Sequence, residues 1–125
     1  MIVYISGPIS GYLDNNKKAF SYAEKEIMKL IKRESIKTEI KVINPVKLGV
    51  KLDKSYRIFD KVPKWEDYMR VCIRELCKSD FVYLLPNWGY SEGAAVEKYL
   101  AERLKIPCAE NINELLILIN RGCKQ

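Results

Sequence analysis

The segment 81–85 restricts the fold of this chain more than any other part of its sequence. Its residues, Phe-Val-Tyr-Leu-Leu, place almost wholly apolar side chains on both faces of an extended chain. Such a strand is typical of a parallel sheet that helices cover on both sides. A second short apolar run, at residues 2–6, breaks at the glycine-containing turn 7–11. We therefore expect an α/β fold around a buried parallel sheet.

Segments with helical spacing separate the apolar runs. Helices are predicted at residues 15–33, 65–79, 91–104 and 112–120, and Asp14 and Asn15 are the expected N-caps of the first. Further strands are predicted at residues 39–43 and 106–109. This alternation predicts a doubly wound, flavodoxin- or Rossmann-like sheet of four or five mainly parallel strands with helices on both faces. Ligands of such sheets bind beyond the carboxyl ends of the strands.

A chain of 125 residues has room for one hydrophobic core, so we expect a single domain spanning residues 1–125. Residues 46–64 show neither helical nor strand periodicity, although Tyr56, Ile58 and Phe59 are able to anchor them. So long a segment without regular structure more often forms a lid or binding loop than a passive connection. A lid-like loop is therefore predicted at about residues 46–64.

The residue types that are missing exclude several kinds of site. The chain has no histidine, which removes His-based triads, His general bases and the commonest zinc sites. Its cysteines form no C-x-x-C pair, and all are expected to be reduced: Cys72, Cys77, Cys108 and Cys123. No metal and no cofactor are predicted, and acid–base chemistry must come from Asp, Glu, Tyr, Cys or water.

Apolar run lengths and charge limit the expected partners. The longest apolar stretches are far shorter than the ~20 residues of a membrane helix, and residues 1–13 lack the basic start of a signal peptide. We expect a cytoplasmic protein without a membrane partner. The net charge of +6 is concentrated in residues 1–64, but the basic residues there are spaced along one helix and one loop. A solvated face explains this pattern, and nucleic acid is not an expected partner.

The turn at residues 7–11 is a candidate anion site. It joins the first strand to the first helix, where backbone N–H groups and serine hydroxyls are able to bind a phosphate. The pattern is neither a P-loop nor a dinucleotide fingerprint, and a purely structural turn fits it equally well. The candidate phosphate-binding residues here are Ser6, Gly7, Pro8, Ile9, Ser10 and Gly11.

Glu97 is the most informative polar residue. Helical spacing places it on the apolar face of its helix with Gly93 and Leu100, whereas Lys98 points elsewhere. A buried carboxylate is costly without a partner or a purpose, and Gly93 leaves room for a ligand to approach it. Two structural explanations stay open: Glu97 favours the positive end of the helix, or Tyr4 or a backbone amide satisfies it.

Several motifs, taken in order, resemble a known family. They are Tyr4-Ile5-Ser6-Gly7-Pro8-Ile9-Ser10-Gly11, Asn44-Pro45, Trp65 with Tyr68-Met69-Arg70, and Asp80 through Leu85-Pro86-x-Trp88 to Ser91-x-Gly93-Ala94-x-x-Glu97. This order is similar to the nucleoside 2-deoxyribosyltransferase-like superfamily, most closely its small bacterial and phage members, related to 2′-deoxynucleoside 5′-monophosphate N-hydrolases. The resemblance covers nearly the whole chain except residues 46–64.

The resemblance implies an enzyme of nucleotide metabolism that acts at the N-glycosidic bond of a nucleoside 5′-monophosphate or a nucleoside. The glutamate that matches Glu97 is the family's nucleophile and forms a glycosyl-enzyme intermediate, as in retaining glycosidases. The tyrosine that matches Tyr4 hydrogen-bonds that carboxylate. We therefore expect a nucleotide N-glycosidase, which is a hydrolase, or a nucleoside deoxyribosyltransferase.

Position 91 separates two substrate classes within the resembling family. Transferases of free nucleosides carry an aspartate there, whereas 5′-monophosphate hydrolases carry a serine, and this chain has Ser91. A serine hydroxyl beside the Gly93 amide at a helix N-terminus is able to bind a phosphate that an aspartate would repel. A helix N-cap is the structural alternative for Ser91, and the two roles are compatible. Asn87 and Trp88, in the same loop, complete the substrate-binding candidates.

The chain departs from the family at one catalytic position. The family's catalytic aspartate falls eight residues before the aspartate that matches Asp80, and this position is Cys72. Cysteine is mostly neutral near pH 7 and accepts hydrogen bonds weakly. Asp67 and Glu75 lie about one helical turn from Cys72 without matching the pattern, and Asp80 is expected to begin the strand. Protonation of the leaving group then depends on water, or activity is low or lost.

Three functions from different classes stay open on the sequence. The first is the enzyme with Glu97 as nucleophile, and the second is a catalytically silent nucleotide-binding module. The third is a basic nucleic-acid-binding protein, supported only by the charge of residues 1–64. Enzymes of the resembling family usually complete their sites with a neighbouring subunit, and the apolar residues 115–119 offer a self-complementary patch. We therefore expect a homodimer or a larger homo-oligomer.

Overall fold

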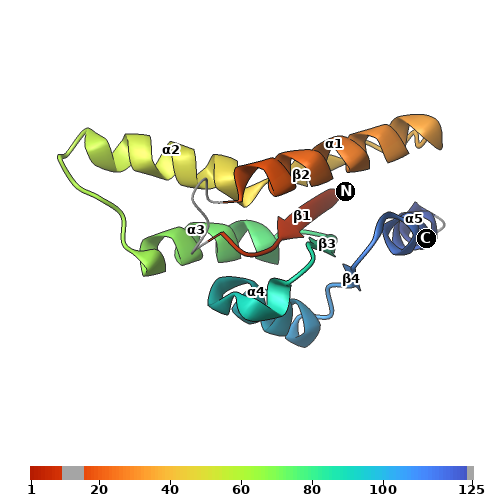
Figure 1. Ribbon diagram of the computed structural model, residues 1–125. Coiled ribbons are helices and arrows are strands. Elements are labelled where there is room, and N and C mark those ends of the chain that lie inside the picture. The colour runs from red at the N-terminus through yellow and green to blue at the C-terminus, as the bar shows by residue number, and fades with distance from the viewer. Residues whose placement is uncertain (10–15, 124–125) are drawn as a thin grey trace.

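The computed structural model of the chain describes residues 1–9 and 16–123, and its centre is a four-stranded parallel sheet. The strands lie in the order β2-β1-β3-β4, with β1 at Ile2–Ser6, β2 at Lys41–Ile43, β3 at Phe81–Leu84 and β4 at Cys108–Ala109 (Figure 1). The two apolar runs, β1 and β3, pair in the middle of the sheet, with Val3 opposite Phe81. The predicted doubly wound parallel α/β fold is confirmed.

Helices cover both faces of the sheet. α1 (Lys17–Arg33) and α5 (Ile112–Cys123) pack on one face, and α3 (Trp65–Cys77) and α4 (Glu92–Arg103) pack on the other. β1 contributes to both cores because its side chains alternate: Val3 and Ile5 point toward α1, and Tyr4 points toward α3. These helices begin and end within a few residues of their predicted bounds, whereas β2 is shorter than predicted.

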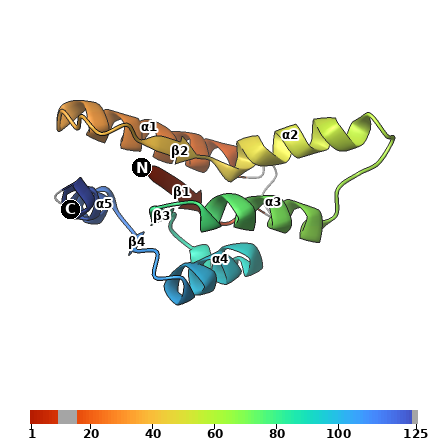
Figure 2. The same cartoon turned by 180° about the vertical axis from the view of Figure 1, so that it is seen from behind.

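Residues 45–57 form a helix, α2 (Pro45–Arg57), so the prediction of a lid-like loop without regular structure at residues 46–64 is wrong. Within the range 46–64, only residues 58–64, which connect α2 to α3, lack helix and strand. Two of the expected anchors are exposed, Ile58 by 79% and Phe59 by 73%. In both views of the molecule α2 runs beside α3 past the carboxyl end of β1 (Figure 1, Figure 2).

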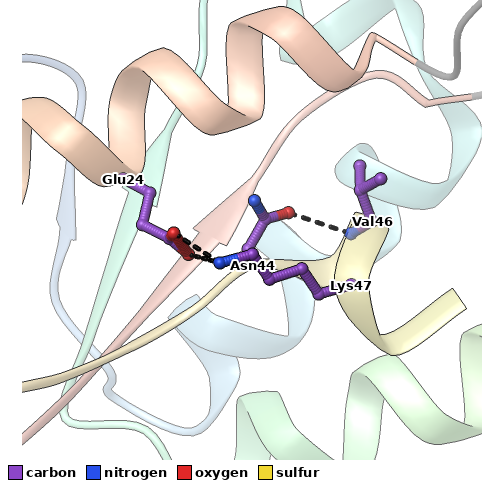
Figure 3. A network of polar contacts seen from close by, with 4 residues as sticks. All are labelled: Glu24, Asn44, Val46 and Lys47. Carbon is purple, nitrogen blue, oxygen red and sulfur yellow. Dashed lines mark hydrogen bonds and ion pairs between the residues drawn. The ribbon is translucent and has the colours of Figure 1, made fainter. Parts of the chain in front are cut away.

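The start of α2 explains why this helix forms. The Asn44 side-chain oxygen accepts a hydrogen bond from the Val46 backbone N–H at 3.0 Å, and Pro45 suits the first turn because no backbone donor is needed there. The Lys47 ammonium pairs with the Glu24 carboxylate at 2.7 Å and joins α2 to α1 (Figure 3). The Asn44-Pro45 pair therefore both ends β2 and begins a helix.

The predicted N-caps of α1, Asp14 and Asn15, lie outside the described residues. Asn16 directly precedes α1 with a φ of 58°, a left-handed conformation that asparagine tolerates. Its side-chain amide donates a hydrogen bond to the Pro8 carbonyl at 2.9 Å. This bond joins the residues after β1 to the start of α1.

The apolar face of α5 lies mostly inside the molecule. Leu115 and Ile119 are fully buried in the core that α1 and the sheet form, and Ile117 is the exposed apolar residue of the patch expected at residues 115–119. The helix therefore covers the sheet and leaves little apolar surface for a second subunit, and an oligomer stays a prediction.

Candidate functional site

A pocket of about 230 Å³ lies at the carboxyl end of β1. β2 and β3 flank β1 on opposite sides, so the chain leaves β1 in one direction and returns on the other side, which is the switch point where doubly wound sheets bind ligands. The pocket is lined by residues after β1, one face of α2, one face of α3 and the first turns of α4. The lining includes these residues proposed from the sequence: Gly7, Ile9, Cys72, Ser91, Gly93 and Glu97.

Two hydroxyls of β1 hold Glu97 at the pocket. Glu97 is only 5% exposed, and its Oε2 accepts a hydrogen bond from the Tyr4 phenol while its Oε1 accepts one from the Ser6 hydroxyl at 2.8 Å. Tyr4 and Ser6 are two residues apart on the strand, so both side chains point to the same face. The expected contact between Tyr4 and Glu97 is confirmed. Ser6 contacts the carboxylate and does not line the pocket, so its position does not support binding of a phosphate.

Burial sets the protonation of Glu97. Loss of hydration disfavours the charged form and raises the pKa of Glu97 to about 7, although the hydrogen bonds from Tyr4 and Ser6 lower it. Burial and the nearby Glu97 carboxylate raise the pKa of the Tyr4 phenol well above its ordinary value, so the phenol keeps its proton and donates it. Both forms of Glu97 are populated near neutral pH, where a carboxyl group is able to act as nucleophile or proton donor.

Cys72 lies beside this pair and remains a thiol. It is buried on α3 and lines the pocket. Burial, followed by the Glu97 carboxylate, raises the pKa of Cys72 to about 11, against a hydrogen bond with Tyr4 that lowers it. Position 72 therefore supplies neither a carboxylate nor an effective proton donor at neutral pH.

Ser91 and Gly93 bring the start of α4 to the pocket. The Ser91 hydroxyl oxygen accepts a hydrogen bond from the Ala94 N–H at 3.2 Å, so Ser91 is the N-cap of the helix. A Cβ at position 93 would lie 3.2 Å from the Met69 sulfur, which explains a glycine where α4 approaches α3 closely. The free N–H groups and the dipole at this end of α4 favour an anionic group of a ligand.

The turn after β1 contributes fewer residues to the pocket than the sequence predicted. Gly7 and Ile9 line the pocket, and Pro8 does not. A Cβ at position 7 would lie 2.8 Å from the Leu85 side chain, so a glycine is needed for the ends of β1 and β3 to pack together. The other proposed phosphate-binding residues, Ser10 and Gly11, lie outside the described residues.

Asn87 and Trp88 do not line the pocket, so their positions do not support the predicted contact with substrate. The Trp88 indole N–H donates a hydrogen bond to the Glu110 carboxylate at 3.0 Å, and the Lys98 ammonium lies 4.8 Å from the centre of its ring. Asn87 adopts a φ of 66° ahead of the short 3-10 turn η1 (Trp88–Tyr90). These contacts hold Trp88 against Lys98 of α4 and against Glu110.

The carboxylates near Cys72 in the sequence do not replace the missing aspartate. Asp67 accepts a hydrogen bond from the backbone at the start of α3, and Glu75 forms an ion pair with Lys78, the C-cap residue of the same helix. Asp80 accepts a hydrogen bond from the Ile2 N–H at 2.7 Å, at the opposite end of the strands, as expected for a residue that begins β3. None of the three lines the pocket.

Asp53 is a charged residue of the pocket that sequence reasoning missed, as it missed Val46, Gly49 and Val50 of the same helix. It lies on α2 and accepts a hydrogen bond from the Tyr68 phenol of α3. This bond, followed by burial, raises the pKa of Tyr68 to about 12. Trp65, about one turn before Tyr68, also lines the pocket, and these three residues are named the α2–α3 wall. The signal that could have found Asp53 is Asn44-Pro45, a helix start that places position 53 in the third turn.

Residues 1–109 match a family model described as a domain of unknown function, DUF4406. The chain belongs to the DUF4406 family. Neither the curated proteins nor the solved structures give a match to it. The DUF4406 match includes every residue that lines the pocket and ends before α5, so the pocket belongs to the part of the chain that defines the family.

In residues 1–9 and 16–123, no group of three or more His, Cys, Asp or Glu side chains is placed to hold a metal ion. Over the same ranges, no helix is long and apolar enough to cross a membrane. The pocket combines an oriented carboxylate at Glu97 with a helix N-terminus that favours an anion, an arrangement that suits nucleophilic attack on an anionic ligand.

Proposed function

We propose that this DUF4406 domain cleaves or transfers at the N-glycosidic bond of a nucleoside 5′-monophosphate, or of a nucleoside. The observation that carries the proposal is Glu97, a buried carboxylate held by two hydroxyls at a pocket where a parallel sheet binds ligands. The resemblance of its motifs to the nucleoside 2-deoxyribosyltransferase-like superfamily supports the same chemistry.

In the proposed reaction the ionised Glu97 carboxylate attacks C1′ of the sugar. The C1′–N bond breaks, the base leaves with the bonding electron pair and takes a proton from water, and a glycosyl-enzyme ester forms. Water then attacks C1′, releases Glu97 and loses its proton to solvent, whereas attack by a second base gives transfer. The hydrogen bonds from Tyr4 and Ser6 hold the carboxylate in position for both steps.

The start of α4 supports a 5′-phosphate as the anionic end of the substrate. Ser91 and Gly93 both line the pocket, and the free N–H groups of a helix N-terminus bind phosphate well. The Ser91 oxygen accepts the Ala94 N–H, which leaves the hydroxyl proton available for a phosphate oxygen. The N-cap role of Ser91 and the proposed phosphate role are therefore compatible.

Base release from a panel of nucleoside 5′-monophosphates tests this function. We expect the native chain to release free base, measured by chromatography, and Glu97→Gln to release none, because the amide keeps the shape of the side chain without its nucleophilic charge. Glu92→Gln is the matched control, since Glu92 is exposed in the first turn of the same helix. Release that persists in Glu97→Gln would contradict the proposal, as would a native chain that neither binds nor cleaves any monophosphate.

Cys72 favours a second candidate, a catalytically silent nucleotide-binding module. With a pKa raised to about 11, the thiol does not protonate a leaving base efficiently. This candidate keeps the pocket and the helix N-terminus without turnover. Saturable binding of a monophosphate with neither base release nor base exchange would select it over the enzyme.

We also propose a cytoplasmic homodimer or larger homo-oligomer, by analogy with the resembling enzymes. The buried face of α5 does not supply the expected patch, so the contact would form elsewhere. Light scattering at micromolar concentration is the test. A mass near the 14.6 kDa of one chain would overturn the proposal.

A further inference from the structure

The α2–α3 wall takes no part in the reaction proposed above, yet it presents a fixed polar group to the pocket. The Tyr68 phenol donates its hydrogen bond to Asp53 Oδ1, which orients the carboxylate. Among the described residues, Asp53 Oδ2 has no hydrogen-bond partner. A carboxylate accepts hydrogen bonds and donates none, so the wall offers a free acceptor to whatever fills the pocket.

The charges of the pocket determine which end of a nucleotide faces this wall. An anion is favoured at the start of α4 and is disfavoured beside Asp53, because like charges repel. A monophosphate with its phosphate at Ser91 and its C1′ at Glu97 therefore directs its uncharged base to the remaining lining. Trp65 supplies an aromatic ring there, on which a base is able to stack.

We propose that Asp53 is the specificity-determining residue for the base, that Tyr68 positions it, and that the pocket prefers a guanine base. Guanine presents two adjacent donors, its ring N–H and its amino group, to the two oxygens of a carboxylate, because Oδ1 keeps a second lone pair beside the bond from Tyr68. Hypoxanthine presents only the ring N–H. Adenine presents an amino group next to a ring nitrogen that is itself an acceptor and faces the carboxylate unfavourably. This inference rests on the proposed function, since it assigns the base end of the same site.

Binding to the Glu97→Gln variant tests the preference without turnover. The probes are the 5′-monophosphates of 2′-deoxyguanosine, 2′-deoxyinosine and 2′-deoxyadenosine, with 2-deoxyribose 5-phosphate as the ligand that has no base, all measured by calorimetry. We expect the guanine nucleotide to bind roughly tenfold to a hundredfold more tightly than the adenine nucleotide, as for a side chain that makes two hydrogen bonds to one base. The hypoxanthine nucleotide is expected between them.

Asp53→Asn, added to Glu97→Gln, is the decisive variant. A carboxamide presents one acceptor and one donor, which matches the adenine edge, so the preference is expected to reverse from guanine to adenine. Asp60→Asn is the matched control: it makes the same chemical change at an exposed turn residue outside the pocket and should leave the order unchanged. Tyr68→Phe removes the positioning bond and should reduce the ratio of guanine to adenine affinity without changing the affinity for 2-deoxyribose 5-phosphate.

The outcomes separate this inference from the function on which it rests. Equal affinity for the three nucleotides, or an order that survives Asp53→Asn, would overturn the role of Asp53 and leave the proposed function standing. Failure of every nucleotide and of 2-deoxyribose 5-phosphate to bind would overturn both. Asp53 lies partly exposed on α2, so the asparagine variant is expected to fold, and its melting temperature verifies this.

Discussion

The two sides of the pocket differ in their contact with water. On one side, Tyr4 and Ser6 are completely buried and Glu97 nearly so. On the other, Trp65 is 44% exposed and Val50 of α2 is 47% exposed. A buried carboxylate has a shifted pKa and a fixed position, whereas exposed groups exchange water for ligand easily. On the proposed function, the chain therefore separates bond breaking from recognition of the base.

The two sides are also anchored differently. β1 lies in the middle of the sheet with both of its faces in apolar cores. α4 packs against the rest of the chain through the buried side chains of Ala94 and Ala101. α2 buries only Pro45, and it depends on the Asn44 cap and the ion pair of Lys47. Segments with few buried apolar groups open at lower cost. Substitutions beside Glu97 should thus change chemistry and global stability, and those on the wall should change recognition and local stability.

After the loss expected for Glu97→Gln, Cys72→Asp should have the largest effect on the rate of base release. Two neighbouring carboxyls do not both ionise readily, so one of the pair with Glu97 keeps a proton that it is able to give to the leaving base. Positioned acid–base groups contribute ~10²–10⁴-fold in rate, and base release should rise toward that range. Cys77→Asp, an exposed change on the same helix, is the control.

Burial of an aspartate at position 72 also costs stability, so the melting temperature must be measured beside the rate. A folded Cys72→Asp variant that is no faster than the native chain would show that the missing aspartate does not limit activity. A native chain that already releases base rapidly would show the same.

The stability of the chain should fall as the pH rises through the range in which Glu97 ionises. The pKa of Glu97 is about 7 in the folded chain against an ordinary value of 4.5, so the folded state binds this proton more tightly. The contribution is complete below pH 4.5 and is lost by pH 8, and the loss is about 3 kcal/mol. Urea unfolding at several pH values should show this loss in the native chain and not in Glu97→Gln. Equal pH dependence of the two proteins would contradict the burial of an ionisable carboxyl at this position.

The Glu97 side could be predicted because its signals are local. Apolar runs identified β1 and β3, helical spacing put Glu97 on the buried face of α4, and the family resemblance paired it with Tyr4. Alternation along the strand places Ser6 on the same face as Tyr4, so this second donor was within reach of sequence reasoning.

The α2–α3 wall could not be predicted from periodicity, because α2 buries too few apolar side chains to show one. A side-chain cap begins this helix, and an ion pair to Glu24, 23 residues before Lys47, fixes it. The position of the Trp88 side chain outside the pocket could not be predicted either, because its hydrogen-bond partner Glu110 is 22 residues away in the sequence. Contacts of this range depend on the assembled fold, which spacing along the chain does not encode.

Ser91→Asp should separate phosphate binding from the rest of the pocket. Like-charge repulsion acts only on the phosphorylated ligand, so we expect 2′-deoxyguanosine 5′-monophosphate to bind roughly tenfold or more weakly and the free nucleoside to change little. Aspartate is as good an N-cap as serine, and α4 should keep its start. Ser91→Asn, a cap without charge, is the control. Equal loss of both ligands, or no change in either, would rule out a phosphate beside Ser91.

Substitutions at the start of α2 should have the smallest effects, and Asn44→Ala tests the anchoring of this helix directly. Loss of an N-cap typically costs about 1 kcal/mol, and here the loss falls on the helix that carries Asp53. Lys47→Ala removes an ion pair with a largely exposed lysine and should cost less, within ~0–1 kcal/mol. Amide hydrogen exchange locates the change: Asn44→Ala should speed exchange in α2 while the amides of β1 keep their protection. Faster exchange in β1 as well would mean that the two sides of the pocket open as one unit, and the contrast between a rigid Glu97 side and a separately anchored wall would then be wrong.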